Sequence, residues 1–427
     1  MRIVVLGSGA REHAVAARLA AESGVAVLCA PGNPGIAREL PVAPVVATDP
    51  AAVLDLATSW GADLTVVGPE APLAAGVADR FLAAGRPLFG PTRAAARLET
   101  SKAFAKEVMA AAGVPTARAR ICDSLEAALA AVRGEDLGWP LVVKADGLAG
   151  GKGVVIAADV TAAERAVRAA MVDGAFGSAG ARVVLEECLI GEELSYFVIA
   201  DGERFVACGS AQDHKRLLDG DQGPNTGGMG AFAPAVAATA AVTEQIEREV
   251  VRPVLSAMAG AATPFRGFLY CGLMLTSSGP KVIEFNCRFG DPEAQVVLPL
   301  LDEPLSALLL AASTGAPLPA RARFSRDVAA GVVLASAGYP NELSVGHAIT
   351  GLDQVAAECP TAAVRFAGVA ERDGSLVTSG GRVLTVIGRG PSYKAAIDAA
   401  YAAARRVSFH GVQYRTDIGR RALAARP

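Results

Sequence analysis

The sequence predicts a multidomain protein of mixed α/β and α+β class that opens with a parallel α/β unit. Over the first hundred residues, short apolar runs alternate with helical periodicity, a pattern typical of a parallel sheet covered by helices. From about residue 117 this alternation gives way to longer β-like stretches. The segment 315–320, rich in alanine and proline, is expected to link a last region, from about residue 327, that again mixes strands with a helix.

In the first region, four short apolar runs are expected as buried strands: Arg2–Leu6, Val25–Cys29, Leu64–Val67 and Pro87–Phe89. Helical periodicity lies between them at Glu12–Ala21, Ala51–Ser59 and Leu73–Ala83. Ligands of such sheets bind at the carboxyl ends of the strands. The loops 31–35 and 68–70 are therefore expected to line one crevice.

The middle region is expected to begin as a small unit of short strands and helices and to continue with longer strands. The small unit has helices at Ser124–Val132 and Ala162–Met171. Strands are expected at 141–143, 154–156, Val183–Glu186, Glu193–Ala200, Phe205–Gly209, Gly267–Leu275 and Lys281–Asn286. Helices are expected near Thr243–Met258, from Asp291, from Glu303 and at Tyr393–Arg405.

The bulk composition excludes several classes of protein. The net charge is −3 with both signs interspersed, so nothing favours a nucleic-acid partner. The seven cysteines include no C-x-x-C pair, which argues against a disulfide framework and against a zinc site. No uninterrupted apolar run reaches membrane-spanning length, and the first residues do not form a signal peptide. We therefore expect a cytoplasmic protein with no membrane partner.

The segment 144–153, Lys-Ala-Asp-Gly-Leu-Ala-Gly-Gly-Lys-Gly, is the most informative stretch of the chain. Its glycines allow the backbone to approach a ligand closely, and its lysines suit a polyphosphate. It does not match G-x-x-x-x-G-K-[ST], and strands are expected on both sides of it. Two interpretations carry equal weight at this point: a hairpin that folds over a nucleotide, and an exposed flexible turn.

The segment 7–13 follows the first strand and resembles the start of a dinucleotide fingerprint, but it fails in two respects. Glu12 stands where the third glycine belongs, and no acidic residue ends the second strand. A helix N-terminus after Gly-x-Gly still favours an anion. We expect a substrate phosphate or carboxylate here rather than NAD, with a tight turn that binds nothing as the alternative.

Three further segments give signals for a nucleotide or substrate. Lys102 begins a helix, where a phosphate partner would explain a cation better than the helix dipole does. The strand–turn–strand 183–193 could meet a purine and its ribose, although acidic surface turns are common. Four glycines among residues 223–230 are much less ordinary and indicate a segment that is either disordered or shaped around a ligand, and the polar, charged neighbour 212–216 favours the ligand.

The strand 281–286 places Glu284 and Asn286 on one face, with Ile283 and Phe285 on the other face in the core. Two oxygen ligands without His or Cys suit a hard cation such as Mg²⁺ that bridges phosphates. A solvated polar face is the alternative. Asp291 is a natural N-cap, with proline at the first helical position. Nothing indicates Ser/His/Asp or Cys/His catalysis, and no G-x-S-x-G elbow occurs.

These segments, taken in order, resemble the ATP-grasp enzymes, and among them the phosphoribosylamine–glycine ligases of purine biosynthesis. The resemblance spans nearly the whole chain and is carried by residues 7–14, 67–70, 101–104, 144–153, 212–216, 223–230, 284–293, 380–384 and 414–419. Single departures from the family pattern are Ala10, Thr100 and Cys287. The family's His-Ala-Gly-Thr stands here as Phe366–Val369, which puts a polar role of that segment in doubt.

The resemblance implies an N-terminal parallel α/β (pre-ATP-grasp) domain over 1–100 and a two-part ATP-grasp module. That module would have a main domain at 101–122 and 191–325 and a lid at 123–190, followed by a small mixed α/β C-terminal domain at 326–427. It implies ligation of glycine to 5-phosphoribosylamine through glycyl phosphate, with ATP and Mg²⁺ or Mn²⁺. We expect these small molecules as partners and a monomeric protein.

The resemblance also implies roles for individual residues. Lys144, Asp213 and Arg288 are the expected catalytic group, in which Lys144 holds phosphate, Asp213 binds the glycine ammonium and Arg288 stabilises the transferring phosphoryl group. ATP would be bound by Lys102, Lys144, the flap glycines Gly150, Gly151 and Gly153, the adenine contacts Glu186, Glu187 and Leu189, and the ribose contact Glu193. Substrate would be bound by Gly9, Glu12, Asp213, Asn225, Gly228, Arg288 and Asp291, and the metal by Glu284 and Asn286.

Other functions compete with this one. Another purine-pathway ATP-grasp ligase would use bicarbonate or formate, but segments 213–216 and 223–230 argue against it. A biotin-dependent carboxylase lacks support because the chain has no Met-Lys-Met sequence. A non-catalytic nucleotide-binding protein on the same fold is disfavoured by the retained lysines and metal-ligand candidates. An NAD-dependent dehydrogenase is the weakest alternative, since the fingerprint fails.

Overall fold

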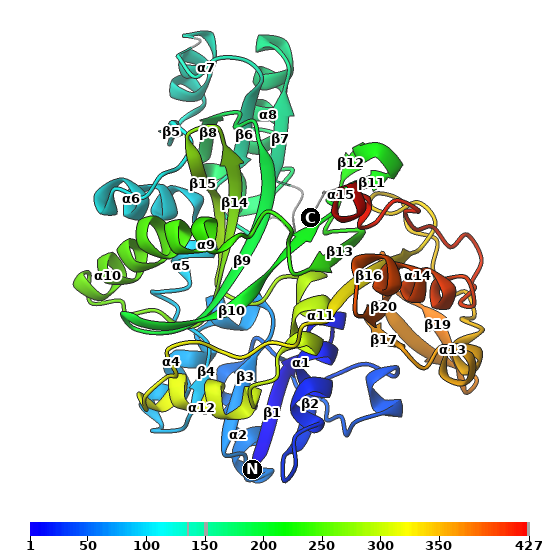
Figure 1. The fold of residues 1–427 in the computed structure, drawn as a ribbon. Helices are drawn as coiled ribbons and strands as arrows, with labels where there is room; N and C mark the ends of the chain where they lie inside the picture. Colours follow the sequence, from blue (N-terminus) through cyan, green and yellow to red (C-terminus); the bar gives the residue numbers. More distant parts are fainter. Residues whose placement is uncertain (135, 149–152, 425–427) are drawn as a thin grey trace.

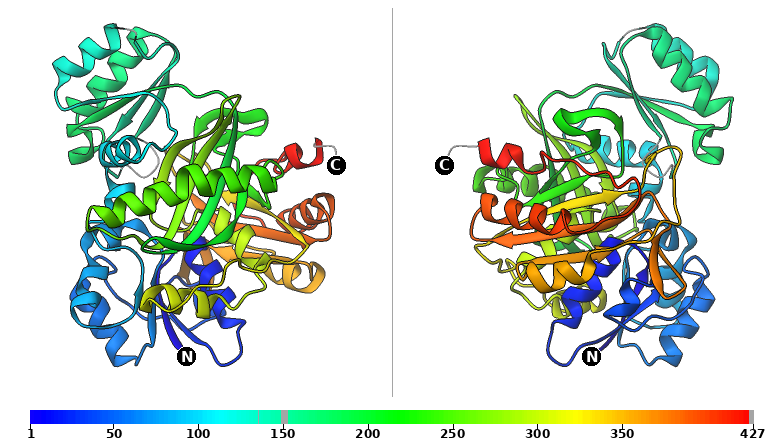
Figure 2. Two further views of the ribbon diagram at one scale, coloured as in Figure 1. Left: turned by 60° about the vertical axis from the view of Figure 1, so that its left-hand side comes forward. Right: turned by 90° about the vertical axis from the view of Figure 1, so that its right-hand side faces the viewer.

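The computed structural model describes residues 1–134, 136–148 and 153–424. Within that part of the chain, a large central sheet separates an N-terminal unit from a small lid, and a C-terminal unit lies beside the centre (Figures 1 and 2). No helix of the described residues is long and apolar enough to cross a membrane.

The N-terminal unit is a parallel sheet in the order β2-β1-β3-β4, which confirms the predicted parallel α/β architecture. Its strands are β1 (Arg2–Gly7), β2 (Ala26–Pro31), β3 (Leu64–Val67) and β4 (Leu88–Phe89), and its first helices are α1 (Ala10–Ala20) and α2 (Pro50–Ser59). Residues 3–7 of β1 are all buried, because both faces of the sheet are covered.

The predicted helix Leu73–Ala83 is wrong as a single element. It is divided into α3 (Glu70–Ala75) and α4 (Val77–Ala83) by Gly76, whose φ of +88° ends one helix and redirects the chain. Apolar periodicity continues through Gly76, so the pattern alone does not show the break.

The central sheet has eight antiparallel strands in the order β15-β14-β9-β10-β13-β16-β20-β17. Five of them precede the predicted boundary at residue 326: β9 (Glu192–Asp201), β10 (Arg204–Asp213), β13 (Gly230–Ala233), β14 (Arg266–Thr276) and β15 (Gly279–Asn286). The other three follow it: β16 (Val328–Ala335), β17 (Ala362–Phe366) and β20 (Arg382–Gly390). The C-terminal unit thus shares a sheet with the centre, and the exact domain limits stay a prediction.

Helices of the central region differ in detail from the expected ones. The helix expected at 243–258 is present, but it consists of α9 (Ala240–Ile246), a π-helical turn at Glu247–Val251 and α10 (Arg252–Gly260). Pro253 lacks an N–H group, which interrupts the α-helical hydrogen bonds at this point. Shorter helices are α5 (Arg97–Thr100), α6 (Lys102–Ala112), α11 (Glu293–Val297) and α12 (Leu305–Thr314).

The predicted helix start at Asp291, with Asp291 as N-cap, is wrong. Helix α11 begins at Glu293, and the Asp291 carboxylate instead accepts a hydrogen bond from the Gln295 side chain (2.8 Å) and pairs with Arg382 (3.1 Å). The other helix likewise begins at Leu305 rather than at Glu303. The Asp291 carboxylate is therefore engaged by Gln295 and by Arg382 of the C-terminal unit instead of capping a helix.

The lid is a four-stranded antiparallel sheet in the order β5-β8-β6-β7. Its strands are β5 (Ala119–Cys122), β6 (Leu141–Ala145), β7 (Val154–Ala157) and β8 (Val183–Glu187), and its helices are α7 (Leu125–Arg133) and α8 (Val160–Met171). Strands β6 and β7 pair directly, with Lys144 opposite Val154. The glycine-rich segment therefore connects two antiparallel strands, as the sequence predicts.

The C-terminal unit places α14 (Tyr393–Ala404) against β16 and β20 and ends in α15 (Arg420–Ala424). Phe366, in the segment that departs from the family pattern, docks this unit on the N-terminal unit. Its backbone N–H donates to Nδ1 of the buried His13 (3.0 Å), and the two rings stack at 5.7 Å. Burial lowers the pKa of His13, which favours the neutral ring that can accept this bond. Segment 366–369 thus serves unit docking through its backbone and an aromatic ring.

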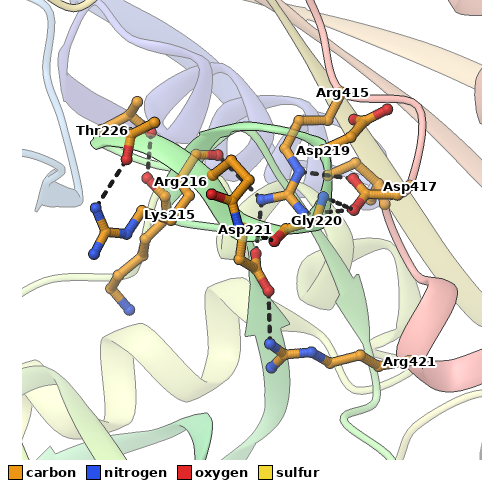
Figure 3. A network of polar contacts seen from close by, with 12 residues as sticks. Lys215, Arg216, Asp219, Gly220, Asp221, Thr226, Arg415, Asp417 and Arg421 are labelled. Atoms are coloured by element: carbon orange, nitrogen blue, oxygen red, sulfur yellow. Dashed lines mark hydrogen bonds and ion pairs between the residues drawn. The ribbon is translucent and has the colours of Figure 1, made fainter.

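Residues 216–225 form a small ribbon of β11 (Arg216–Leu218) and β12 (Gln222–Asn225), clamped by the C-terminal segment (Figure 3). The buried Arg415 bridges Asp221 (2.8 Å) on the ribbon and Asp417 (2.7 Å) on its own segment. The Gly220 N–H donates to Asp417 as well (2.8 Å). Of the two possibilities for the glycine-rich stretch, the structure thus shows an ordered one.

Candidate active site

Three lysine side chains approach one another where the lid meets the edge of the central sheet. Lys144 on β6 donates from Nζ to Glu186 Oε2 on β8 (3.0 Å) and to the Ile283 carbonyl oxygen on β15 (3.0 Å). Nζ of Lys106 on α6 lies 3.3 Å from the same Glu186 oxygen. Lys102, one helical turn earlier, donates to a carbonyl oxygen at the base of the flap (3.1 Å). Lid, helix and sheet together therefore concentrate positive charge here.

Lys102, Lys106 and Lys144 are here called the lysine cluster, and burial lowers the pKa of two of them, Lys102 and Lys106. The pKa of Lys106 is lowered to about 8, chiefly by burial, with Lys144 adding repulsion and Glu186 opposing both. Burial also lowers the pKa of Lys102, against the attraction of Glu284. A bound polyphosphate would stabilise the charged forms. Sequence reasoning missed Lys106, although its position four residues after Lys102 puts both on one helix face.

A β-bulge shapes the strand that carries the predicted metal ligands. In the pairing of β14 with β15, Gly272 is opposite Glu284 but Leu273 is opposite Val282, so Ile283 is the extra residue. Val282 and Phe285 are buried in the core, whereas Ile283 is only half-buried. The prediction that Ile283 points into the core is therefore wrong. The bulge frees the Ile283 carbonyl, which accepts from Lys144.

Glu284 and Asn286 lie two residues apart on β15, with the buried Phe285 between them. Among the described residues, no group of three or more His, Cys, Asp or Glu side chains could hold a metal ion. Two protein oxygens would thus leave most of the coordination sphere to phosphate oxygens and water, which is how Mg²⁺ is commonly bound. The donor set fits this hard cation, and the metal role stays a prediction.

A partly buried group rich in carboxylates lies around Lys215 and is here called the acidic cluster (Glu193, Asp213, Lys215, Glu284 and Glu293). A small cavity there is lined by Glu193, Leu194, Ser195, Lys215, Tyr270, Gly272, Leu273, Ile283 and Glu284. Lys215 Nζ lies 2.8 Å from Glu193 Oε2 and 3.0 Å from Asp213 Oδ1. The Ser195 hydroxyl donates to Glu293 Oε1 (3.0 Å). Glu193 and Asp213 therefore share one lysine, and Glu284 and Glu293 add negative charge close to it.

Protonation in the acidic cluster follows this excess of negative charge. Burial opposes a charge on Lys215, yet Asp213 and Glu193 raise its pKa well above the ordinary value. Burial raises the pKa of Asp213. The pKa of Glu293 is raised to about 7 by burial and by the neighbouring Asp213. An additional cation would relieve this strain, so the cluster favours an ammonium or metal ligand.

Arg288 links the central and N-terminal units. Its guanidinium lies 3.2 Å from Glu70 Oε2 and 2.9 Å from Glu99 Oε1, and it also donates to the Phe289 carbonyl (3.1 Å). Burial opposes the charge of Arg288, but Glu99 and Glu70 raise its pKa. Both carboxylates lie far from Arg288 in the sequence; Glu70 belongs to the loop 68–70 that was expected to line the crevice, whereas Glu99 was not predicted as a site residue.

The predicted substrate residues Gly9 and Glu12 lie at the N-terminus of α1. The Glu12 carboxylate accepts from the Gly9 N–H (2.7 Å) and pairs with Arg11 (2.5 Å). Its side chain is buried against Gly7 and Gly68, where an added Cβ would come within 2.3 Å of Glu12 Cγ. Glu12 thus occupies the anion position of its own helix, and its contact with substrate stays a prediction.

Two other predicted substrate residues differ in their surroundings. Gly228, with φ +109°, lies where a Cβ would come 2.5 Å from Pro292. The neighbouring Gly227 carbonyl accepts from Arg382 (2.6 Å), which also pairs with Asp291 (3.1 Å). Asn225 is exposed on the β11–β12 ribbon. The structure therefore brings Gly228 and Asp291 together but leaves Asn225 at the surface.

The adenine candidates lie at the end of β8. The Glu187 N–H donates to the Arg118 carbonyl (3.0 Å), and its carboxylate pairs with the Arg118 side chain (2.7 Å). Leu189 is half-buried in the turn that follows. In the flap, the Gly153 carbonyl accepts from Ala145 (2.8 Å). Gly150 and Gly151 lie outside the described residues.

Comparison with known proteins gives consistent matches over the whole chain. Residues 1–99 match the N domain of phosphoribosylglycinamide synthetase, 100–294 its ATP-grasp (A) domain and 329–421 its C domain. The phosphoribosylamine–glycine ligase of Streptomyces coelicolor is 49% identical over 435 residues, with all of both chains covered. That of Ralstonia nicotianae is 47% identical, with 99% of this chain and 100% of the relative covered.

Solved structures agree with these matches. The crystal structure of phosphoribosylamine–glycine ligase from Thermotoga maritima has a TM-score of 0.84 and 34% identity, and covers 98% of this chain and 100% of that one. Biotin carboxylase from Campylobacter jejuni is 14% identical with a TM-score of 0.72, covering 96% of this chain and 92% of that one, which shows a shared fold alone.

Proposed function

The chain belongs to the phosphoribosylglycinamide synthetase family and acts as a phosphoribosylamine–glycine ligase of purine biosynthesis, and we propose that its lysine and acidic clusters bind different parts of the reactants. The observation that carries this proposal is their convergence on β15. Ile283 and Glu284 line the cavity of the acidic cluster, and the Ile283 carbonyl also holds Lys144 of the lysine cluster.

ATP-grasp enzymes use ATP and Mg²⁺, and the lysine cluster suits the phosphates of ATP. We assign Lys102 and Lys144, together with Lys106, to neutralising phosphate charge, because positioning and charge neutralisation are what phosphoryl transfer requires. Glu284 and Asn286 would hold Mg²⁺ or Mn²⁺, which when bound neutralises charge on the phosphate oxygens. Glu186, Glu187 and Leu189 would meet adenine, and Glu193 the ribose.

Glycine must be activated, because a carboxylate is a poor electrophile. One carboxylate oxygen of glycine attacks the γ-phosphorus, the bond to the β-phosphate oxygen breaks, and ADP leaves. The amine of phosphoribosylamine then attacks the carbonyl carbon of glycyl phosphate, phosphate departs with the activated oxygen, and the nitrogen loses a proton. Arg288 would stabilise the transferring phosphoryl group, and the flap that contains Gly150, Gly151 and Gly153 would exclude water.

The acidic cluster suits the other end of glycine. Asp213 and its carboxylate neighbours outnumber Lys215, and the ammonium group of glycine would supply a further positive charge. With the ammonium held there and the phosphates at the lysine cluster, the glycine carboxylate would lie between the two.

Phosphoribosylamine would bind where the three units meet. Gly9 and Glu12 come from the N-terminal unit, Arg288, Asp291 and Gly228 from the centre, and Arg382 pairs with Asp291 from the C-terminal unit. Arginine is the side chain best suited to a phosphate. Asn225, exposed on the clamped ribbon, would reach substrate only at the margin of this site. A cytoplasmic monomer completes the proposal.

The proposal is tested by measuring ADP release with each substrate omitted in turn. We expect turnover to require both glycine and phosphoribosylamine. Turnover without glycine, or equal turnover with bicarbonate or formate in its place, would contradict the assignment of the acidic cluster to glycine.

A further inference from the structure

One buried carboxylate, that of Glu99 on α5, holds three consecutive residues at the end of β15. Oε2 accepts from the Cys287 backbone N–H (2.7 Å), and Oε1 lies 2.9 Å from Nη2 of Arg288. The Asn286 amide, assigned from its hydrogen-bond partners, donates from Nδ2 to the same Oε1 (3.0 Å) and to the Phe285 carbonyl (3.3 Å). Glu99 therefore contacts one side of the Asn286 amide and fixes which end faces it.

The two ends of an amide are not equivalent for a cation. Only the oxygen coordinates a metal ion, and a half-turn of the side chain would present NH₂ in its place. An ionised carboxylate accepts hydrogen bonds and donates none, so it selects the orientation with Nδ2 toward Glu99. The amide oxygen then lies on the opposite side of the group. Burial raises the pKa of Glu99 and favours its neutral form, but Arg288 opposes that change.

We propose that Glu99 is a positioning residue that keeps the amide oxygen of Asn286 available to the divalent cation. This inference rests on the metal role proposed for Glu284 and Asn286. Partners in the second layer around a metal ligand commonly change metal affinity by about 10- to 100-fold when they are replaced.

Glu70 provides a matched control within the same network. Glu70 pairs with the same guanidinium (Arg288 Nε to Glu70 Oε2, 3.2 Å). Among the described contacts of the Asn286 amide, the carboxylate is that of Glu99 and not that of Glu70. Neutralising either acid therefore removes a partner of Arg288. Only the Glu99 change removes the acceptor that orients Asn286.

The substitution Glu99→Gln keeps the size of the side chain and introduces a conflict. Both carboxylate oxygens of Glu99 face donors, so the new NH₂ group must face either the Cys287 N–H or, in the place of Oε1, both the Asn286 side chain and Arg288 Nη2. The backbone N–H cannot turn over, whereas the Asn286 amide can, and the Arg288 guanidinium keeps Glu70 as a partner. We therefore expect Asn286 to flip and to present NH₂ toward the cation.

The test measures Mn²⁺ binding to the full chain in the presence of the β,γ-imido analogue of ATP, from the electron paramagnetic resonance signal of free Mn²⁺. We expect the Kd for Mn²⁺ to rise about 10- to 100-fold in Glu99→Gln and less than about threefold in Glu70→Gln. An unchanged Kd in Glu99→Gln, or an equal rise in both variants, would overturn the proposal. No Mn²⁺ binding by the native protein would remove the metal site itself and this inference with it.

A double variant keeps the proposal testable if Glu99→Gln folds poorly. In Glu99→Gln with Asn286→Asp, the new carboxylate has two equivalent oxygens, and the new glutamine can donate to one of them. We expect this pair to recover Mn²⁺ affinity, whereas Asn286→Asp alone places two carboxylates about 3 Å apart and binds Mn²⁺ less tightly. Failure of the double variant to bind better than either single variant would contradict the orienting role.

Discussion

Replacing Arg415 by methionine is expected to release the β11–β12 ribbon from the C-terminal segment. Arg415 is 2% exposed and bridges Asp221 and Asp417, and it also donates to the Arg216 carbonyl (3.1 Å). Methionine keeps much of the apolar stem but removes every one of these hydrogen bonds. The ribbon would then open locally, while the eight-stranded sheet below it stays folded.

The magnitude follows from the burial of the partners. Removing one partner of a buried ion pair costs about 3–5 kcal/mol. The Asp221 side chain is 40% exposed and keeps Arg421 (2.7 Å), so the lower end, about 3 kcal/mol, applies. Because about 1.4 kcal/mol corresponds to a factor of ten, local opening should become roughly 100-fold more frequent.

Hydrogen exchange read by mass spectrometry measures this opening directly. Peptides that cover residues 216–225 should exchange roughly 100-fold faster in Arg415→Met, because the Gly220 N–H loses its ordered acceptor Asp417. The control is Arg421→Met, which breaks an exposed pair with Asp221 worth at most about 1 kcal/mol and should accelerate exchange by less than about fivefold. Equal exchange in Arg415→Met and native protein, or equal acceleration in both variants, would refute the clamp.

Further predictions concern Lys106, Gly68 and Glu284. The KM for ATP should rise above pH 8 as Lys106, with its pKa lowered to about 8, loses its proton. The variant Lys106→Met should lose most of this pH dependence. A KM that stays constant between pH 7 and 9 in the native protein would exclude the phosphate-binding role of Lys106. The stability of the fold should change in the favourable direction over the same pH range. Burial of charged Lys106 lowers the free energy of unfolding below pH 8, and this penalty is relieved as the pH rises further. Thermal unfolding at pH 7 and 9, with Lys106→Met as reference, would detect the change. Gly68→Ala should lower the free energy of unfolding by about 1–3 kcal/mol, because its Cβ would meet Glu12 Cγ at 2.3 Å. Gly260→Ala has open space around the new Cβ and should not destabilise the protein. Equal melting temperatures for the two variants would contradict this prediction. Glu284→Ala should abolish turnover while leaving the melting temperature near the native value, and near-normal activity would remove its metal role.

Local periodicity predicted the fold where neighbours in the sequence decide the structure. The alternation of apolar runs and helices before residue 100 gave the parallel sheet, and the β-branched runs around the flap gave the β6–β7 hairpin. The breaks were not predictable in this way. Gly76 interrupts a helix whose apolar pattern continues, and Ile283 forms a bulge inside a run that alternates regularly.

Candidate site residues could be named from the sequence where a residue type stands out locally, as for Lys144, Glu284 and Asn286, and their roles stay predictions. The contacts that support these residues could not be predicted, because they join distant parts of the chain. Glu99 reaches Cys287 across 188 positions, and Arg415 reaches the Arg216 carbonyl across 199. Glu12 shows the opposite case. The sequence marked it as a candidate substrate ligand, but its carboxylate is hydrogen-bonded within its own loop.

The fate of the glycine oxygens tests the central claim most directly. If the glycine carboxylate attacks the γ-phosphorus before the amine attacks carbon, glycine labelled with ¹⁸O in its carboxylate must pass one labelled oxygen to the phosphate released. Mass spectrometry of that phosphate should therefore show one ¹⁸O atom in each molecule formed. Phosphate without label would contradict the glycyl phosphate route and the arrangement of the two clusters proposed to support it.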